Sequence, residues 1–145
     1  MSQVITIDPG KNKCGLVLAE IAKKKVYRAI ILKSELLADY VRTLVNSEDI
    51  SEIIIGNGTT SGDIKKKLDF LKQKIITFEE KNTTFRAKER YFELFPISGF
   101  KFLIPREFFI LNKNLDAISA LIILEDYCKI KFTLNQNIDF KTWLK

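Results

Sequence analysis

The chain of 145 residues contains no histidine. This absence excludes Ser-His-Asp and Cys-His catalysis, histidine-ligated zinc and phosphohistidine chemistry. Any acid, base or metal chemistry must therefore use carboxylates, hydroxyls, lysines or water. Only two cysteines are present, Cys14 and Cys128. Their wide separation rules out a CxxC zinc ribbon or redox pair and indicates a reducing compartment.

Long apolar runs and linkers are missing as well. No run approaches the ~18 residues that span a membrane. The opening MSQVITIDPG has no basic region leading into an apolar stretch, so it does not resemble a signal peptide. We expect a cytoplasmic protein with no membrane association. Without a repeat or a linker, this length predicts a single domain, residues 1–145, with its core in 3–128 and a strand or tail in 129–145.

Positive charge exceeds negative charge along the chain. Lys and Arg number 24 against 18 Asp and Glu, which gives a net charge of +6 and a pI near 9.3. A small domain of this charge favours a polyanionic partner such as nucleic acid.

The order of periodic segments predicts an α/β fold. Three strands, at 3–8, 14–22 and 26–32, are joined by short polar turns and indicate an antiparallel meander. A helix capped by Ser34 follows. Strands at 52–55 and 75–78 then alternate with helices around 64–71, from Thr84 to about Phe95 and from Leu115 to about Tyr127. This order implies a mixed five-stranded sheet with a parallel half and helices on both faces, and such sheets carry functional groups at strand ends and helix starts.

Carboxylates stand at those places. Asp8 ends the first strand, Glu79 and Glu80 end the fifth, and Asp116 lies in the first turn of the last helix. Each has a structural alternative: Asp8 can shape a turn, one of the two glutamates must face solvent, and Asp116 can cap its helix. If the sheet gathers them, their mutual repulsion requires a divalent cation. Oxygen ligands without His or Cys suit Mg²⁺ or Mn²⁺.

Four segments carry the residues of a known pattern. Asp8, Gly10 and Gly15 have the spacing Asp-x-Gly-x-x-x-x-Gly. In chain order the segments are ITIDPGKNKCG (5–15), IIIGNGTTS (53–61), FEEKNTTFRAKER (78–90) and LDAISALIILEDY (115–127). Together they resemble the ordered motifs of the YqgF/RuvX family of RNase H-like nucleases.

The resemblance implies an RNase H-like fold with Asp8, Glu80 and Asp116 as catalytic, metal-binding acids. The family is linked to processing of the 5′ end of precursor 16S rRNA, a step of ribosome biogenesis, and is related to the RuvC Holliday junction resolvases. Three features depart from these patterns. Asn57-Gly58 replaces a Leu-Pro sequence, no acid ends the strand at 52–55, and Ser119 stands where RuvC proteins have a second aspartate.

The sequence therefore predicts a Mg²⁺- or Mn²⁺-dependent nuclease acting on structured nucleic acid, with RNA favoured. In this hypothesis Asp8 bridges two ions, and Glu80 and Asp116 hold one each. The side chains expected to bind substrate phosphates are Lys11, Lys13, Lys81, Thr83, Thr84 and Arg86.

Two alternatives stay open. One is a resolvase of branched DNA, which requires a homodimer; the other is a nucleic-acid-binding module without turnover. An actin-like ATPase is excluded by length. The nuclease prediction depends on convergence of the three acids, and basic side chains that hold them with no room for a cation would argue against it.

Aromatic residues are assigned mainly to the core. Phe70, Phe85 and Phe92 fall at the spacing of a buried helix face. Phe108 and Phe109 follow Pro105 and are candidates for a surface contact or a dimer interface.

Overall fold

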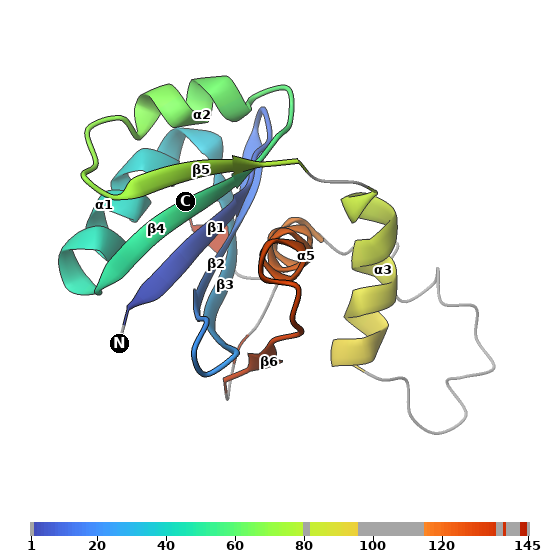
Figure 1. Ribbon diagram of the computed structural model, residues 1–145. Helices are drawn as coiled ribbons and strands as arrows, with labels where there is room; N and C mark the ends of the chain where they lie inside the picture. Colours follow the sequence, from blue (N-terminus) through green and yellow to red (C-terminus); the bar gives the residue numbers. More distant parts are fainter. Residues whose placement is uncertain (1, 80–81, 96–114, 136–137, 139–142, 145) are drawn as a thin grey trace.

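A single mixed β-sheet is the frame of the molecule (Figure 1). The computed structural model describes residues 2–79, 82–95, 115–135, 138 and 143–144. Seven strands are found among them: β1 (Gln3–Asp8), β2 (Lys13–Glu20), β3 (Lys25–Lys33), β4 (Ile50–Gly56), β5 (Lys74–Phe78), β6 (Thr133–Leu134) and β7 (Trp143–Leu144).

The sheet joins an antiparallel half to a parallel half. The strand order is β5-β4-β1-β2-β3-β6, and β7 also pairs with β3. β1, β2 and β3 form the antiparallel meander, whereas β4 runs parallel to β1 and β5 runs parallel to β4. The carboxyl ends of β1, β4 and β5 therefore meet at one edge of the sheet.

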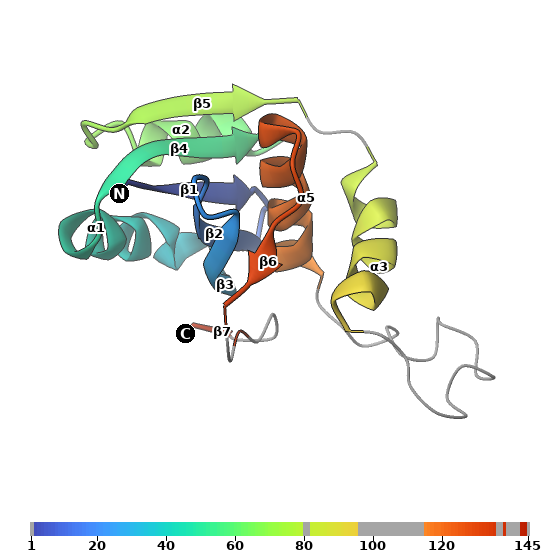
Figure 2. The same cartoon turned by 60° about the horizontal axis from the view of Figure 1, so that its bottom comes forward.

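Helices cover both faces (Figures 1 and 2). On one face α1 (Leu37–Ser47), which follows a 3₁₀ turn at Ser34–Leu36, and α2 (Ser61–Lys67) pack on the sheet. On the other face lies α5 (Asp116–Cys128), with α3 (Thr83–Leu94) on its outer side. The residues of α5 from Ala117 to Glu125 are all buried, because the sheet covers one side of the helix and α3 another.

Side-chain alternation along β1 decides which face each residue takes. Val4 packs with α5, whereas Ile5 and Ile7 pack with α1 and α2. Since side chains alternate along a strand, Asp8 shares the α5 face with Val4. The last residue of β1 is thereby directed toward the start of α5.

The predicted α/β architecture is confirmed, with two differences. The sheet gains two short strands, β6 and β7, which both pair with β3 and add to the five expected. Ser34 does not cap α1, as no side-chain hydrogen bond caps either the 3₁₀ turn or the helix. Its hydroxyl instead donates to the Gly10 carbonyl at 2.7 Å, which joins the β1–β2 turn to the end of β3.

The core assignment of three phenylalanines is right for one of them. Phe92 is buried, but Phe70 and Phe85 are 44% and 67% exposed. Phe70 lies beyond the end of α2 and packs against Arg42, whose guanidinium carbon is 4.4 Å from the ring centroid. Phe85 is exposed because α3 contacts α5 with one side only. Phe108 and Phe109 lie outside the described residues.

No helix in the described part of the chain is long and apolar enough to cross a membrane.

Candidate functional site

Asp8 and Asp116 are brought together by a glycine on β2. Asp8 pairs with Gly15 in the antiparallel register, and Gly15 lies on the same face because Val17, two residues on, packs with α5. A Cβ atom at Gly15 would overlap the main-chain carbonyl of Asp116. Only glycine therefore allows the start of α5 to reach the strand beside Asp8. The close approach brings the first residue of α5 to the end of the sheet at which β1 finishes with Asp8.

The thiol of Cys14 is influenced by both acids. Cys14 is buried on the opposite face of β2, among residues that pack with α1 and α2. Burial raises the pKa of this thiol to about 12; a hydrogen bond with Ser34 opposes the shift, and the negative charges of Asp116 and Asp8 add to it. Two carboxylates that act on one buried group lie in the same region of the structure.

A lysine already neutralises one of the acids. Nζ of Lys13 lies 3.2 Å from Oδ2 of Asp116, and both side chains are partly exposed. Oδ2 itself is buried and accepts no hydrogen bond from the described residues. The contact is therefore an ion pair, because the two atoms are close but lack the geometry of a hydrogen bond. A basic side chain thus holds one predicted metal ligand.

The third predicted acid lies outside the described residues. β5 ends at Phe78, which pairs with Gly56 of β4. Gly56 comes directly after the residue of β4 that pairs with Ile7 of β1, so the ends of the three strands lie level with one another. Glu79 comes next and is exposed. Glu80 and Lys81 are not among the described residues. The structure therefore places two of the three predicted acids together, and Glu80 remains a prediction.

The donor chemistry at this edge fits one hard cation. Mg²⁺ is commonly bound by one or two carboxylates, and waters and substrate phosphates complete its octahedron. Asp8 and Asp116 supply such a pair, and the buried Oδ2 of Asp116 has an unused acceptor. Among the described residues, no group of three or more His, Cys, Asp or Glu side chains forms a metal cluster. The fit extends to one ion, and a second ion requires Glu80.

Basic side chains line a cavity next to these acids. Its volume is about 440 Å³, and its walls come from the β1–β2 turn and the β3–α1 junction. The lining residues are Lys11, Asn12, Lys13, Lys33, Ser34 and Glu35. Lys11 and Lys13 are predicted substrate-binding residues. Lys33 was missed, because only the pairing of β2 with β3 shows that it lies opposite Lys13.

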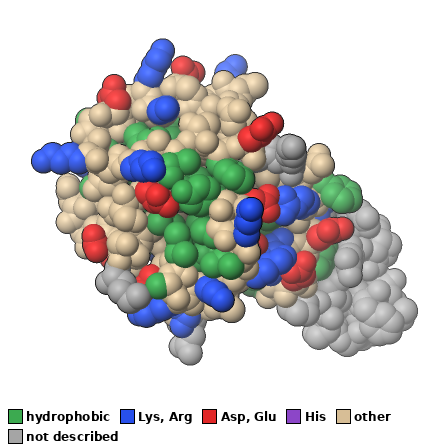
Figure 3. All heavy atoms as spheres, in the orientation of Figure 1, with side chains coloured by type: hydrophobic (Ala, Val, Ile, Leu, Met, Phe, Trp, Pro, Cys, Tyr) green, Lys and Arg blue, Asp and Glu red, His purple; other side chains and the backbone are tan. Residues whose placement is uncertain are grey.

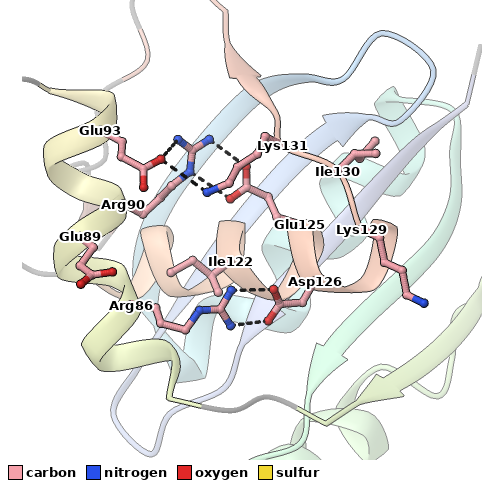
Figure 4. Close-up of a pocket in the computed structure, with 10 residues that line it drawn as sticks. All are labelled: Arg86, Glu89, Arg90, Glu93, Ile122, Glu125, Asp126, Lys129, Ile130 and Lys131. Carbon is pink, nitrogen blue, oxygen red and sulfur yellow. Dashed lines mark hydrogen bonds and ion pairs between the residues drawn. The ribbon is translucent and has the colours of Figure 1, made fainter.

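Arg86 is engaged within the protein. Its two terminal nitrogens donate to Asp126 at 2.6 and 2.7 Å, a bidentate pair that raises the pKa of Arg86 above its ordinary value (Figure 4). Thr83, the first residue of α3, is buried, and Thr84 follows it in the helix. The guanidinium predicted to bind substrate is thus directed toward α5.

A second arginine fastens α3 to α5. Arg90 donates to both carboxylate oxygens of Glu125, at 3.0 and 2.8 Å, and to the Phe132 carbonyl at 2.9 Å. Glu125 also accepts from the Phe132 amide at 2.8 Å. Arg90 and Glu125 line a groove of about 450 Å³ whose charged groups are largely paired with one another (Figure 4). We assign the groove to the attachment of α3.

The face of the molecule seen in Figure 3 does not carry charge of a single sign. Figure 3 shows hydrophobic side chains gathered in the middle of the face, with both basic and acidic side chains around them.

Comparison with known proteins identifies the fold. No protein-family model and no curated protein sequence matches the chain. The structure is similar to RuvC of T. thermophilus, solved in complex with Holliday junction substrate, with a TM-score of 0.52 and 11% sequence identity. The match covers 89% of this chain and 96% of that chain. The chain has the RuvC-like RNase H fold, as the sequence predicts.

Proposed function

We propose that the protein is a divalent-metal-dependent nuclease that hydrolyses phosphodiester bonds in structured nucleic acid. The observation that carries the proposal is the contact of Gly15 with the Asp116 main chain, which seats Asp116 beside Asp8 on one face of a RuvC-like sheet. A net charge of +6 is consistent with a polyanionic substrate.

Asp8 and Asp116 would hold the cation, with Glu80 as the third ligand. A divalent ion at this place supplies Lewis-acid activation of a phosphoryl oxygen and of water, so the lack of histidine is no obstacle. Asp8 lies between the turn that carries Lys11 and Lys13 and the end of β4. A scissile phosphate held by these lysines would therefore lie next to the acids.

The resemblance to the YqgF/RuvX motifs favours an RNA substrate of the precursor 16S rRNA type. The similarity to RuvC, which was solved with a Holliday junction, supports branched DNA as the alternative. A resolvase cuts two strands symmetrically and requires a two-fold dimer in solution.

The test offers the purified protein, with Mn²⁺, a precursor rRNA fragment, single-stranded RNA and a four-way DNA junction. We expect cleavage of one structured substrate that stops on chelation. Asp8→Asn keeps the shape of the site and removes a ligand charge, so cleavage should fall by roughly two orders of magnitude or more. Wild-type rates in Asp8→Asn would falsify the site.

One observation favours a second candidate, a nucleic-acid-binding module without turnover. Lys13 occupies Asp116 with an ammonium group where a cation would otherwise bind. Calorimetry with Mn²⁺ separates the two functions. No heat of binding at millimolar metal, together with salt-sensitive RNA binding, would support the module and exclude the nuclease.

A further inference from the structure

The cavity beside the acids concentrates positive charge on a short stretch of the sheet edge. Lys13 and Lys33 are direct partners in the antiparallel pairing of β2 with β3. Like charges placed opposite each other across two strands destabilise the pair. Lys11 adds a third lysine to the same cavity, and Glu35 is the one acid among the described residues that line it. The local arrangement therefore has a cost in stability that an anionic ligand would remove.

Two of these lysines have no counter-ion in the part of the chain that the structure describes. Lys11 and Lys33 have no carboxylate within 4 Å among the described residues, whereas Lys13 pairs with Asp116. Both Lys11 and Lys33 are exposed. An ammonium in this state is available to a phosphate without first breaking a contact inside the protein.

The walls of the cavity are fixed by hydrogen bonds between the two elements that form it. The Ser34 hydroxyl donates to the Gly10 carbonyl at 2.7 Å, and the Ser34 amide donates to the Asn12 carbonyl at 2.9 Å. A Cβ at Gly10 would overlap the Lys13 carbonyl, so the turn is tightly closed. The lysines thus project from a backbone that is already in place, which lowers the entropic cost of binding.

We propose that Lys11, Lys13 and Lys33 form a binding site for one phosphodiester group of a nucleic-acid backbone, adjacent to Asp116. The inference rests on the proposed function and extends it, because it adds Lys33 and places a substrate phosphate at a defined cavity. Lys13 connects the two sites, since its ammonium contacts Asp116 and the residue also lines the cavity. The site fixes the register of the substrate without reading its sequence.

The test measures binding without metal, so that it does not depend on catalysis. Fluorescence anisotropy in EDTA follows a labelled RNA hairpin and a labelled four-way DNA junction over a salt series. Lys33→Met should weaken binding by about threefold and lower the slope of log affinity against log salt by roughly 0.7–0.9, the value of one phosphate contact. Lys11→Met should act similarly, and Lys33→Arg should restore binding.

Lys24→Met is the matched control. Lys24 is exposed in the β2–β3 turn, at the opposite end of the hairpin from Lys33, so the change in net charge is the same. Equal effects of Lys24→Met and Lys33→Met, or no binding of either probe by the wild type, would overturn the phosphate site. If the protein gave either of these results but still cleaved nucleic acid in the presence of metal, the proposed nuclease function would be retained. If Lys33→Met weakened binding more than Lys24→Met, and the wild type cleaved no substrate, the phosphate site would be supported and the nuclease function rejected.

Discussion

The ammonium of Lys13 lies 3.2 Å from Oδ2 of Asp116, a carboxylate of the proposed metal site. The two side chains come from distant parts of the chain, the start of β2 and the start of α5. A cation bound at Asp116, as proposed above, would therefore compete with the positive charge of Lys13.

Lys13→Met should therefore strengthen metal binding. Part-exposed ion pairs contribute about 0.2–1 kcal/mol, so loss of the competitor should tighten Mn²⁺ binding by a factor of roughly 1.4 to 5. Calorimetry on the wild type, Lys13→Met and Lys24→Met measures this directly. Unchanged or weaker Mn²⁺ binding in Lys13→Met alone would show that Lys13 does not compete for the site.

Gly15→Ala should damage the fold and the site together. The added methyl would overlap the Asp116 carbonyl, so α5 must shift away from β2, at a cost of about 1–3 kcal/mol. Gly62→Ala is the control, because a Cβ there meets nothing within 4 Å and Gly62 lies in α2. That change should leave stability unaltered or raise it by up to about 1 kcal/mol. Urea unfolding of both variants measures the difference, and equal stabilities would disprove the close approach.

The buried pair between Arg90 and Glu125 should be far more important for stability than the outer pair between Arg86 and Asp126. The side chains of Arg90 and Glu125 are 10% and 7% exposed, against 42% and 29% for the outer pair. Removing one partner of a buried pair costs about 3–5 kcal/mol, whereas exposed pairs are worth up to about 1 kcal/mol.

Thermal unfolding of Glu125→Gln and Asp126→Asn tests this difference. We expect a large loss of stability in Glu125→Gln and a small one in Asp126→Asn. Since neither Glu125 nor Asp126 belongs to the proposed site, the folded fraction of each variant should keep its affinity for nucleic acid. A larger loss in Asp126→Asn would contradict the assignment.

The two cysteines should react slowly and in a fixed order. Burial raises the pKa of Cys14 to about 12 and that of Cys128 to about 11, where the charge of Glu52 adds to the effect. Because the thiolate is the reactive form, native protein at pH 8 should be alkylated at Cys128 before Cys14, and both more slowly than after unfolding. Mass spectrometry of iodoacetamide-treated protein checks the order.

The same shifts have a consequence for stability at high pH. Both folded-state pKa values lie above the ordinary value of 9.0, so the folded protein holds these protons more tightly than the unfolded chain. The associated stability is fully present below pH 9 and is lost as pH rises from there toward 11–12. Cys14→Ser should flatten this dependence in urea unfolding at pH 8 and pH 10, and an unchanged slope would contradict it.

The fold could be predicted because its signals are local. The alternation in β1 and the apolar length of α5 each determine an element and the face that it buries. A strand in the segment 129–145 was expected, but the division into β6 and β7 was not, because strands of two residues each are too short for a periodic pattern. Phe85 was misplaced because helical spacing indicates a possible face, whereas only the packing of α3 decides which face is covered.

Residue type and element ends were enough to place Asp8 at the end of β1 and Asp116 at the start of α5. The ion pairs that these residues form could not be predicted in the same way. The contact of Lys13 with Asp116 and that of Arg86 with Asp126 join residues far apart in the chain, so no spacing rule reveals them. Lys33 escaped for the related reason that cross-strand register is needed to place it opposite Lys13.

The pairing of β6 and β7 with β3 also bears on self-association. β3 has nine residues and a run of buried apolar side chains, the composition of an aggregation-prone edge. β6 pairs with one end of it, at Lys25 and Val26, and β7 with the other, at Ile31 and Leu32. A chain truncated after Cys128 would expose this edge to copies of itself. By pairing with both ends of β3, the two short strands leave fewer unpaired backbone groups on this edge of the sheet.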